Sequence, residues 1–146
     1  MGSKLGFAET GKEDEKLITD LLDWMHKNSA DFTNTFLNLC KEEIPNEALY
    51  ASESFQSWHV RWQKRLGEEE QGLDASFTLM RSVNPSVIPR NHKVEEALQS
   101  AEEGDFSLFH DLLGAVEKPY EDGEHLLNYQ APPQPSEQVL ETFCGT

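Results

Sequence analysis

Hydrophobic residues recur at three- and four-residue spacing through most of the chain, which is the pattern of helices that bury one face. Six stretches show this pattern. We predict helices that run from near Thr10, from Asp31, from Ser52 to about Glu69, from Asp74 to Val83, from Pro89 to Gly104 and from Asp105 to Pro119. No stretch alternates with the period of two that a half-buried strand requires. The predicted fold class is therefore mainly α, with about six short-to-medium helices.

The predicted helix boundaries rest on local backbone chemistry. Thr10 and Glu13 have the spacing of a capping box, in which each side chain accepts a hydrogen bond from the other residue's backbone N–H. Asp31 is a residue type that caps helix starts. Asn84-Pro85 ends the fourth helix, because a residue before proline is pushed out of the helical region. Gly104 is suited to end the fifth helix, since glycine adopts the left-handed conformation readily.

Apolar stripes on the first three predicted helices supply a candidate core. Their members are Leu17, Ile18, Leu21, Leu22, Met25, Phe36, Leu39, Phe55, Trp58, Trp62 and Leu66. Tryptophan is also enriched at binding hot spots, but Trp58 and Trp62 stand four residues apart on one stripe and favour a core position. Cys40 shares the apolar face of the second helix with Phe36, and we interpret it as a small buried hydrophobe.

The last part of the chain changes character. Glu121-Asp122-Gly123 is a turn signal. The stretch 129–135 is proline-rich and predicts extended, polyproline-like backbone. Beyond it, Val139, Leu140 and Phe143 are apolar enough to dock onto a partner surface. We therefore expect a helical domain over residues 1–120 and an extended tail over residues 121–146.

Charge narrows the function classes. The chain has 12 Lys plus Arg against 27 Asp plus Glu, a formal charge of −15. Such a surface repels phosphate backbones and anionic membranes, so we expect neither nucleic acid nor a membrane as a partner. No stretch approaches the roughly 20 apolar residues of a membrane span, and no apolar signal region is seen at the start. An intracellular protein is expected.

Few polar residues stand in a pattern that carries chemistry. The five histidines are scattered without the i, i+4 spacing of a helical zinc site, and no Cys-x-x-Cys occurs, so a metalloenzyme is disfavoured. Arg90, Asn91 and His92 form the polar cluster that most invites a functional interpretation. Such residues can contact a neighbouring domain, with Arg90 holding a carboxylate, or they can simply cap and pack the start of a helix. Both interpretations stay open, and the second is favoured.

Several motifs occur together in an order that resembles one protein family. They are Lys4-Leu5-Gly6, Asp31-Phe32-Thr33, the stretch 84–92 (NPSVIPRNH), 103–107 (EGDFS), Lys118-Pro119-Tyr120, 129–133 (YQAPP) and the terminal 142–146 (TFCGT). In this order and spacing they are similar to the C-terminal region of the selenoprotein O (SelO) family of protein adenylyltransferases. No single motif is diagnostic, but the resemblance extends over essentially the whole chain.

The resemblance implies a fold and an activity for the parent protein. SelO-type proteins have a protein-kinase-like fold, bind ATP with a divalent metal such as Mg²⁺, and transfer AMP to Ser, Thr or Tyr of target proteins. This chemistry needs a phosphate loop, basic residues on the phosphates and carboxylate or amide metal ligands. The sequence has no glycine-rich loop, Asp-Phe-Gly or His-Arg-Asp motif. We therefore expect no catalytic, cofactor-binding or metal-binding residue in this chain.

The same resemblance implies the partners and location of the chain. As a C-terminal segment it would pack on an upstream kinase-like domain, which would carry ATP, Mg²⁺ and the contact with protein substrates. Bacterial members are expected in the cytoplasm and eukaryotic relatives in mitochondria. A stand-alone acidic helical module that binds another protein is the alternative. In that case the motifs would serve only the fold.

Cys144 is the one residue with an implied chemical role. SelO-type proteins carry a selenocysteine or cysteine third from the C-terminus, and Cys144 occupies that place. In the family this residue is associated with redox control, through a disulfide to a cysteine of the kinase-like domain. A thiol on a proline-stiffened tail could reach a distant partner and exchange. The competing interpretation is an incidental exposed thiol.

Overall fold

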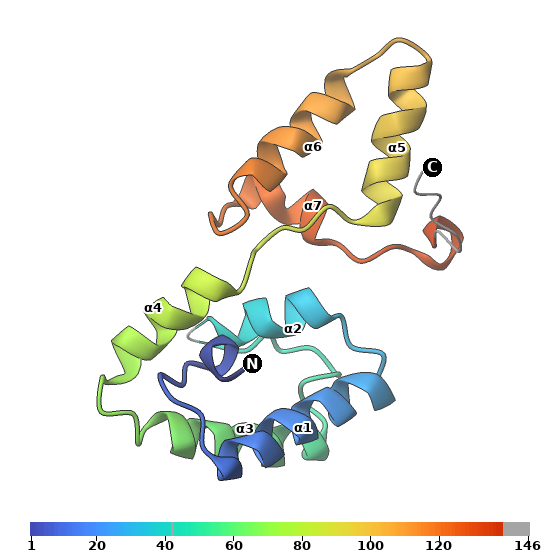
Figure 1. Cartoon of the computed structure of the whole chain (residues 1–146). Helices are drawn as coiled ribbons and strands as arrows, with labels where there is room; N and C mark the ends of the chain where they lie inside the picture. The colour runs from blue at the N-terminus through green and yellow to red at the C-terminus, as the bar shows by residue number, and fades with distance from the viewer. Residues whose placement is uncertain (42, 139–146) are drawn as a thin grey trace. The chain divides into compact units, whose positions relative to one another are not determined.

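The computed structural model describes residues 1–41 and 43–138, and it divides into two compact units, Met1–Pro85 and Ser86–Thr146. We call them the N-terminal and the C-terminal unit (Figure 1). The N-terminal unit contains the 3-10 helix η1 (Gly2–Leu5) and helices α1 (Lys12–Lys27), α2 (Phe32–Leu39), α3 (Glu53–Leu66) and α4 (Leu73–Val83). The C-terminal unit contains α5 (Asn91–Glu102), α6 (Ser107–Glu117), η2 (Glu124–Leu126), α7 (Leu127–Gln130) and η3 (Pro135–Glu137). No strand occurs in the described parts, so the mainly α prediction is confirmed.

The core of the N-terminal unit is built around the tryptophans of α3. Trp58 and Trp62 are each 2% exposed, which confirms their predicted core position. Each indole N–H donates to a backbone carbonyl, that of Trp58 to Leu17 at 2.8 Å and that of Trp62 to Leu5 at 3.0 Å. A buried indole N–H needs such a partner, because leaving it unpaired would cost its hydration. The two bonds fix α1 and η1 against α3.

The chain start packs inside the N-terminal unit. Leu5 and Phe7 are fully buried, and Gly6 between them has φ +86°. A Cβ on Gly6 would lie 2.7 Å from Leu66 Cδ1 and 3.2 Å from Met80 Sδ. Glycine is therefore required twice over at this position, for its left-handed backbone and for the close approach.

The N-cap of the first helix lies one residue later than predicted. Gly11 is the N-cap, and its backbone N–H donates to Asp14 Oδ2 at 2.8 Å. The Thr10–Glu13 capping box is therefore wrong. Thr10 Oγ1 lies against Gly2, where it would be 2.1 Å from an added Cβ. The predicted cap of the second helix is confirmed, because the Asp31 side chain accepts from Asn34 N–H at 2.8 Å.

The C-terminal unit is a helical hairpin closed at its base. Gly104 follows α5 with φ +94°, as expected of a residue that ends a helix. Asp105 Oδ1 then accepts from the backbone N–H of Ser107 at 2.9 Å. At the base, the Ser86 N–H donates to Pro119 O at 2.6 Å, and its hydroxyl donates to Glu121 O. The enclosed core is small and consists of Val87, Ala115 and Leu126 with Val116 and Tyr129 packed against it.

Extended backbone begins later than the sequence predicted. Tyr129 and Gln130 belong to α7, and Ala131 is the first extended residue after it, with φ −60° and ψ 130°. The predicted extension over residues 129–135 is therefore wrong at Tyr129 and Gln130, where the helix continues up to the Ala131-Pro132-Pro133 run. It is also wrong at Pro135, which begins η3. The predicted boundary at residues 120/121 stays a prediction. None of the described helices is long and apolar enough to cross a membrane.

Candidate functional site

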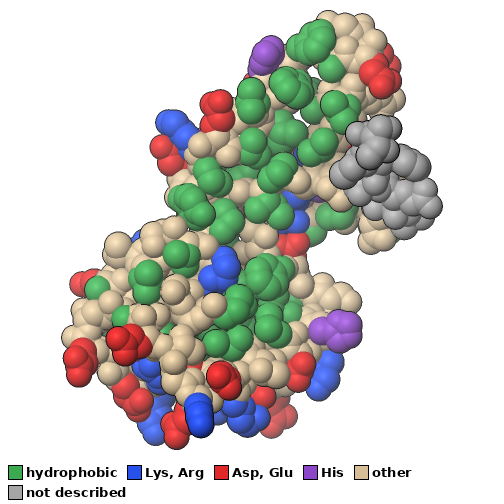
Figure 2. Space-filling model, viewed as in Figure 1, with side chains coloured by type: hydrophobic (Ala, Val, Ile, Leu, Met, Phe, Trp, Pro, Cys, Tyr) green, Lys and Arg blue, Asp and Glu red, His purple; other side chains and the backbone are tan. Residues whose placement is uncertain are grey.

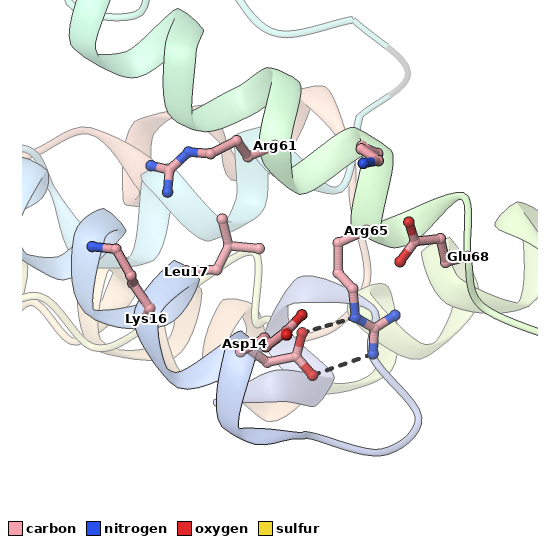
Figure 3. A pocket seen from close by; sticks show the side chains of 8 residues that line it. Asp14, Lys16, Leu17, Arg61, Arg65 and Glu68 are labelled. Atoms are coloured by element: carbon pink, nitrogen blue, oxygen red, sulfur yellow. Dashed lines mark hydrogen bonds and ion pairs between the residues drawn. The ribbon is translucent and has the colours of Figure 1, made fainter.

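A charged cluster of the N-terminal unit surrounds Arg65 on α3. Arg65 Nε donates to Asp14 Oδ1 at 2.8 Å and Arg65 Nη1 to Glu69 Oε1 at 2.6 Å (Figure 3 shows the Asp14 pair). The guanidinium also lies 4.6 Å from the centre of the Phe7 ring. Burial alone would raise the pKa of the Asp14 carboxyl. Hydrogen bonds from Arg65 and from Gly11 N–H outweigh this, so the pKa lies below its usual range.

This cluster borders a surface hollow of about 250 Å³. Its lining residues are Glu13, Asp14, Lys16, Leu17, Arg61, Lys64, Arg65 and Glu68. Arg61 pairs with Asp20 at 2.8 Å, and Lys16 pairs with the same carboxylate at 3.0 Å. The hydrogen bond from Arg61 lowers the pKa of Asp20 most. Three of the four cations thus already have carboxylate partners, and the hollow does not suit the phosphates of a nucleotide.

A second polar cluster joins the chain start to the end of α4. Lys4 Nζ donates to Val83 O at 2.8 Å and to Asn84 Oδ1 at 3.1 Å, and Asn84 Nδ2 donates to Lys4 O at 2.9 Å. Asn84 Nδ2 also lies 3.4 Å from Cys40 Sγ. Burial raises the pKa of the Cys40 thiol, which makes it a poor nucleophile. The interpretation of Cys40 as a buried hydrophobe is confirmed, at 7% exposed.

A larger and more apolar groove runs along α3 and α4. It measures about 630 Å³, and its lining includes Ile44, His59, Trp62, Leu66, Leu73 and Phe77. The His59 ring stacks on Phe55 at 5.6 Å and on Trp62 at 5.2 Å between centroids. Burial lowers the pKa of His59. The groove could accommodate an apolar group, and Lys41, Glu43, Gln56 and Gln63 also line it.

The structure brings the predicted cluster of Arg90, Asn91 and His92 to one hollow in the C-terminal unit. Arg90 is the N-cap of α5 and is 8% exposed, whereas Asn91 is exposed and His92 half-buried. The hollow measures about 420 Å³ and is also lined by Ile88, Pro89, Pro133, Glu137 and Gln138. The placement fits helix-start packing. A contact with another domain stays a prediction.

The predicted redox residue and the predicted absence of a metal site remain to be placed. Cys144 lies outside the described residues. Within residues 1–41 and 43–138, no group of three or more His, Cys, Asp or Glu side chains could hold a metal ion.

Sequence reasoning missed both polar clusters of the N-terminal unit. Asp14 and Arg65 are 51 positions apart and Lys4 and Asn84 are 80 positions apart, so no local pattern joins them. One signal was available for the second pair. Lys4 and Asn84 both belong to motifs that carried the family resemblance, and the fold brings those motifs into contact.

Comparisons with known proteins identify relatives over the whole chain. The family model "Protein adenylyltransferase SelO" matches residues 1–117. The chain is 49% identical to a protein nucleotidyltransferase YdiU of Alcanivorax borkumensis, 46% to that of Nitrosococcus oceani and 45% to that of Syntrophotalea carbinolica. Each match covers 100% of this chain but 30% of the relative, so the chain spans less than a third of the length of these proteins. These matches show that the chain belongs to the SelO family of protein adenylyltransferases.

Proposed function

We propose that this chain serves a SelO-type adenylyltransferase as a helical support region, while the rest of a full-length member carries out AMP transfer to Ser, Thr or Tyr hydroxyls. The observation that carries the proposal is the pattern of the matches. Relatives named as nucleotidyltransferases match 100% of this chain, yet the matched stretch is only 30% of their length. A part of this size, with its own packed core, supports a structural role within a larger enzyme.

The polar clusters favour the same interpretation. Nucleotidyl transfer needs cations that are free to hold phosphates and carboxylates that are free to hold metal. In the N-terminal unit, Arg65 is held by Asp14 and Glu69, and Arg61 is held by Asp20. The pairs with Asp14 and Asp20 hold α1 against α3. We therefore place the ATP and Mg²⁺ sites in the remaining part of a full-length protein.

Transfer of a label from ATP tests this division of labour. The chain would be incubated with ATP labelled on the α-phosphate, Mg²⁺ and a protein acceptor. We expect no labelled acceptor. A chimera in which this chain replaces the stretch that it matches in the Alcanivorax borkumensis relative should transfer label, as should that relative itself. Label transfer by the chain alone, or an active relative with an inactive folded chimera, would contradict the proposal.

We further propose that Cys144 is a redox residue of the full-length protein, and this rests on the family resemblance. The Cys144 thiolate would attack glutathione disulfide, form a mixed disulfide with one glutathione and release the other as a thiolate. A thiol of the kinase-like domain could then displace the second glutathione. Oxidised glutathione should change label transfer by the chimera, and Cys144→Ser should abolish the change. Cys40→Ser is the matched control, because the Cys40 thiol is buried and its pKa is raised. Oxidant sensitivity that persists in Cys144→Ser would contradict this role.

A further inference from the structure

The apolar side chains of α6 occupy a wide arc of the helix, and α5 covers only part of that arc. Leu112 and Ala115 face the hairpin interior and are 8% exposed each. Phe106, Phe109 and Leu113 are 55%, 40% and 41% exposed. At 3.6 residues per turn, positions i, i+3 and i+7 fall on one side of a helix. These three residues therefore form a stripe beside the buried one, and we call it the α6 stripe.

The α6 stripe belongs to a broader apolar surface. Leu98 of the neighbouring helix α5 is 47% exposed, and Leu108 of α6 is 38% exposed. Figure 2 shows hydrophobic side chains gathered over α5 and α6 on the face in view. Single exposed apolar residues are ordinary, but a cluster of leucines and phenylalanines on one hairpin is typical of a surface that another protein surface covers.

The charges around this surface argue against a second copy of the chain as its cover. Between Asn91 and Lys118 the sequence has seven acidic and two basic residues, a formal charge of −5. Acidic residues such as Glu102, Asp105 and Asp111 are exposed on the same hairpin. Two copies meeting here would bring two acidic surfaces together, and like charges at an interface are unfavourable. A surface complementary to this one would have an apolar centre and Lys or Arg at its rim.

The length of the relatives points to the source of that surface. The chain accounts for 30% of the polypeptide in each relative named above. We propose that the α6 stripe, with Leu98, is the surface on which the remaining part of a full-length SelO-type polypeptide packs, through an apolar patch with a basic rim. The inference rests on the proposed function and adds to it the face by which the support region is attached.

Hydroxyl-radical footprinting tests the location of the contact. Radicals oxidise phenylalanine and leucine side chains that water can reach. In the chain alone, Phe106 and Phe109 should be oxidised, whereas in the chimera described above both should lose most of this modification. Val60 is an apolar side chain of α3 that is 64% exposed, and its oxidation serves as an internal reference. Equal oxidation of Phe106 and Phe109 in the chain and the folded chimera would overturn the proposal.

A matched pair of variants tests the energetics of the contact. Phe109→Glu combined with Leu113→Glu places two charges on the α6 stripe, and we expect the chimera to lose thermal stability or become sensitive to proteolysis. Val60→Glu places a charge on a more exposed apolar residue and should leave the chimera unchanged. In the chain alone the double variant should lose less stability than in the chimera, since Phe109 and Leu113 are 40% and 41% exposed there. Equal effects of the two variants on the chimera would contradict the assignment.

Two further measurements cover the other outcomes. Light scattering of the chain alone should give a monomer, and a dimer that Phe109→Glu with Leu113→Glu dissolves would assign the surface to a second copy and overturn the proposal. If the chimera does not fold, hydrogen exchange in the Alcanivorax borkumensis relative replaces it. The helix aligned with α6 should exchange more slowly there than α6 does in this chain, and faster or equal exchange would overturn the proposal.

The test keeps this inference separate from the proposed function. Protection of Phe106 and Phe109 in a chimera that transfers no AMP would support the surface and contradict the function. If the chimera transfers AMP while Phe106 and Phe109 are oxidised as strongly as in the chain alone, the proposed function is supported and the proposed contact surface is contradicted.

Discussion

The two units of this chain use their hydrophobic residues in opposite ways. In the N-terminal unit, large side chains such as Trp58, Phe55 and Phe7 are at most 2% exposed. Among the described residues of the C-terminal unit, Val87 is the largest side chain that is almost fully buried, at 1% exposed. Phe106 and Phe109 of the same unit are 55% and 40% exposed. Similar residue types thus stabilise one unit from within and leave the other with an open surface. The two units therefore differ in how completely they bury their large apolar side chains.

The sharpest test of this contrast removes one aromatic residue from each unit. Trp58→Ala should destabilise the chain by roughly 4 kcal/mol, the range found for large aromatic residues in cores. It also leaves Leu17 O without its 2.8 Å donor. Phe106→Ala should change stability by less than about 0.5 kcal/mol, as is usual at exposed positions. Urea unfolding of both variants measures the difference, and comparable losses would remove the contrast.

The second test compares two glycines with similar backbone but different surroundings. Gly6 and Gly104 have φ +86° and +94°, and an added Cβ meets Leu66 and Met80 at Gly6 but nothing within 4 Å at Gly104. Gly104→Ala should cost about 1 kcal/mol for the left-handed backbone alone. Gly6→Ala should cost roughly 3 kcal/mol, because overpacking is added to the same strain. Thermal unfolding of the two variants isolates packing, and equal shifts would show that Leu66 moves aside freely.

A third test concerns the ion pair of Asp14. Asp14→Asn should cost about 2 kcal/mol at neutral pH, since a buried charge-assisted hydrogen bond is lost. Asp20→Asn, at a more exposed pair, should cost under about 1 kcal/mol. The pKa of Asp14 is lower in the folded chain than in the unfolded chain, where it is about 3.9. The Asp14 carboxylate therefore stabilises the fold fully above the unfolded pKa, and this stabilisation is lost as pH falls through the folded pKa. The free energies of unfolding of the wild type and of Asp14→Asn, measured with urea, should therefore converge in acid. A difference between them that does not change with pH would contradict the role of the Asp14 charge.

The smallest expected effect comes from His59. Its pKa is lowered by burial, so as pH falls below about 6.5 the unfolded chain takes up this proton before the folded chain does. Stability should therefore decline from about pH 6.5 down to the folded-state pKa. The free energy of unfolding should change by less than about 1.4 kcal/mol per pH unit, which is the limit for one linked proton. His59→Gln should flatten this slope when urea unfolding is measured at several pH values, and an unchanged slope would contradict the role of His59.

The elements of this fold follow from local patterns, and their boundaries follow less well. The apolar stripe of α3 and the Asp31 cap depend on neighbours within four residues, so periodicity and capping rules locate them. The Thr10–Glu13 box satisfied the same rules and was wrong, because Thr10 lies against Gly2 instead. A rule based on spacing does not include such a contact.

The polar clusters could not be predicted, for a related reason. The partners of Arg65 and of Lys4 lie 51 and 80 positions away, and only the packing of whole helices brings them together. The open surface on α6 is a similar case. The sequence shows that Phe106, Phe109 and Leu113 are apolar, but which part of a wide apolar arc stays uncovered depends on where α5 packs.

The bond network between Lys4 and Asn84 has a consequence for how the chain folds. The N-terminal unit is closed by contacts between its first turn and residues 80 positions later, and the indole of Trp62 reaches back 57 positions to Leu5. Contacts of such sequence separation form late, because the loop between them must first be ordered. During synthesis, helices α1 to α3 therefore wait with an incomplete core until Asn84 has left the ribosome. Until then the side chain and the carbonyl of Lys4 lack their Asn84 partners, and Met80 has not yet been added to the core.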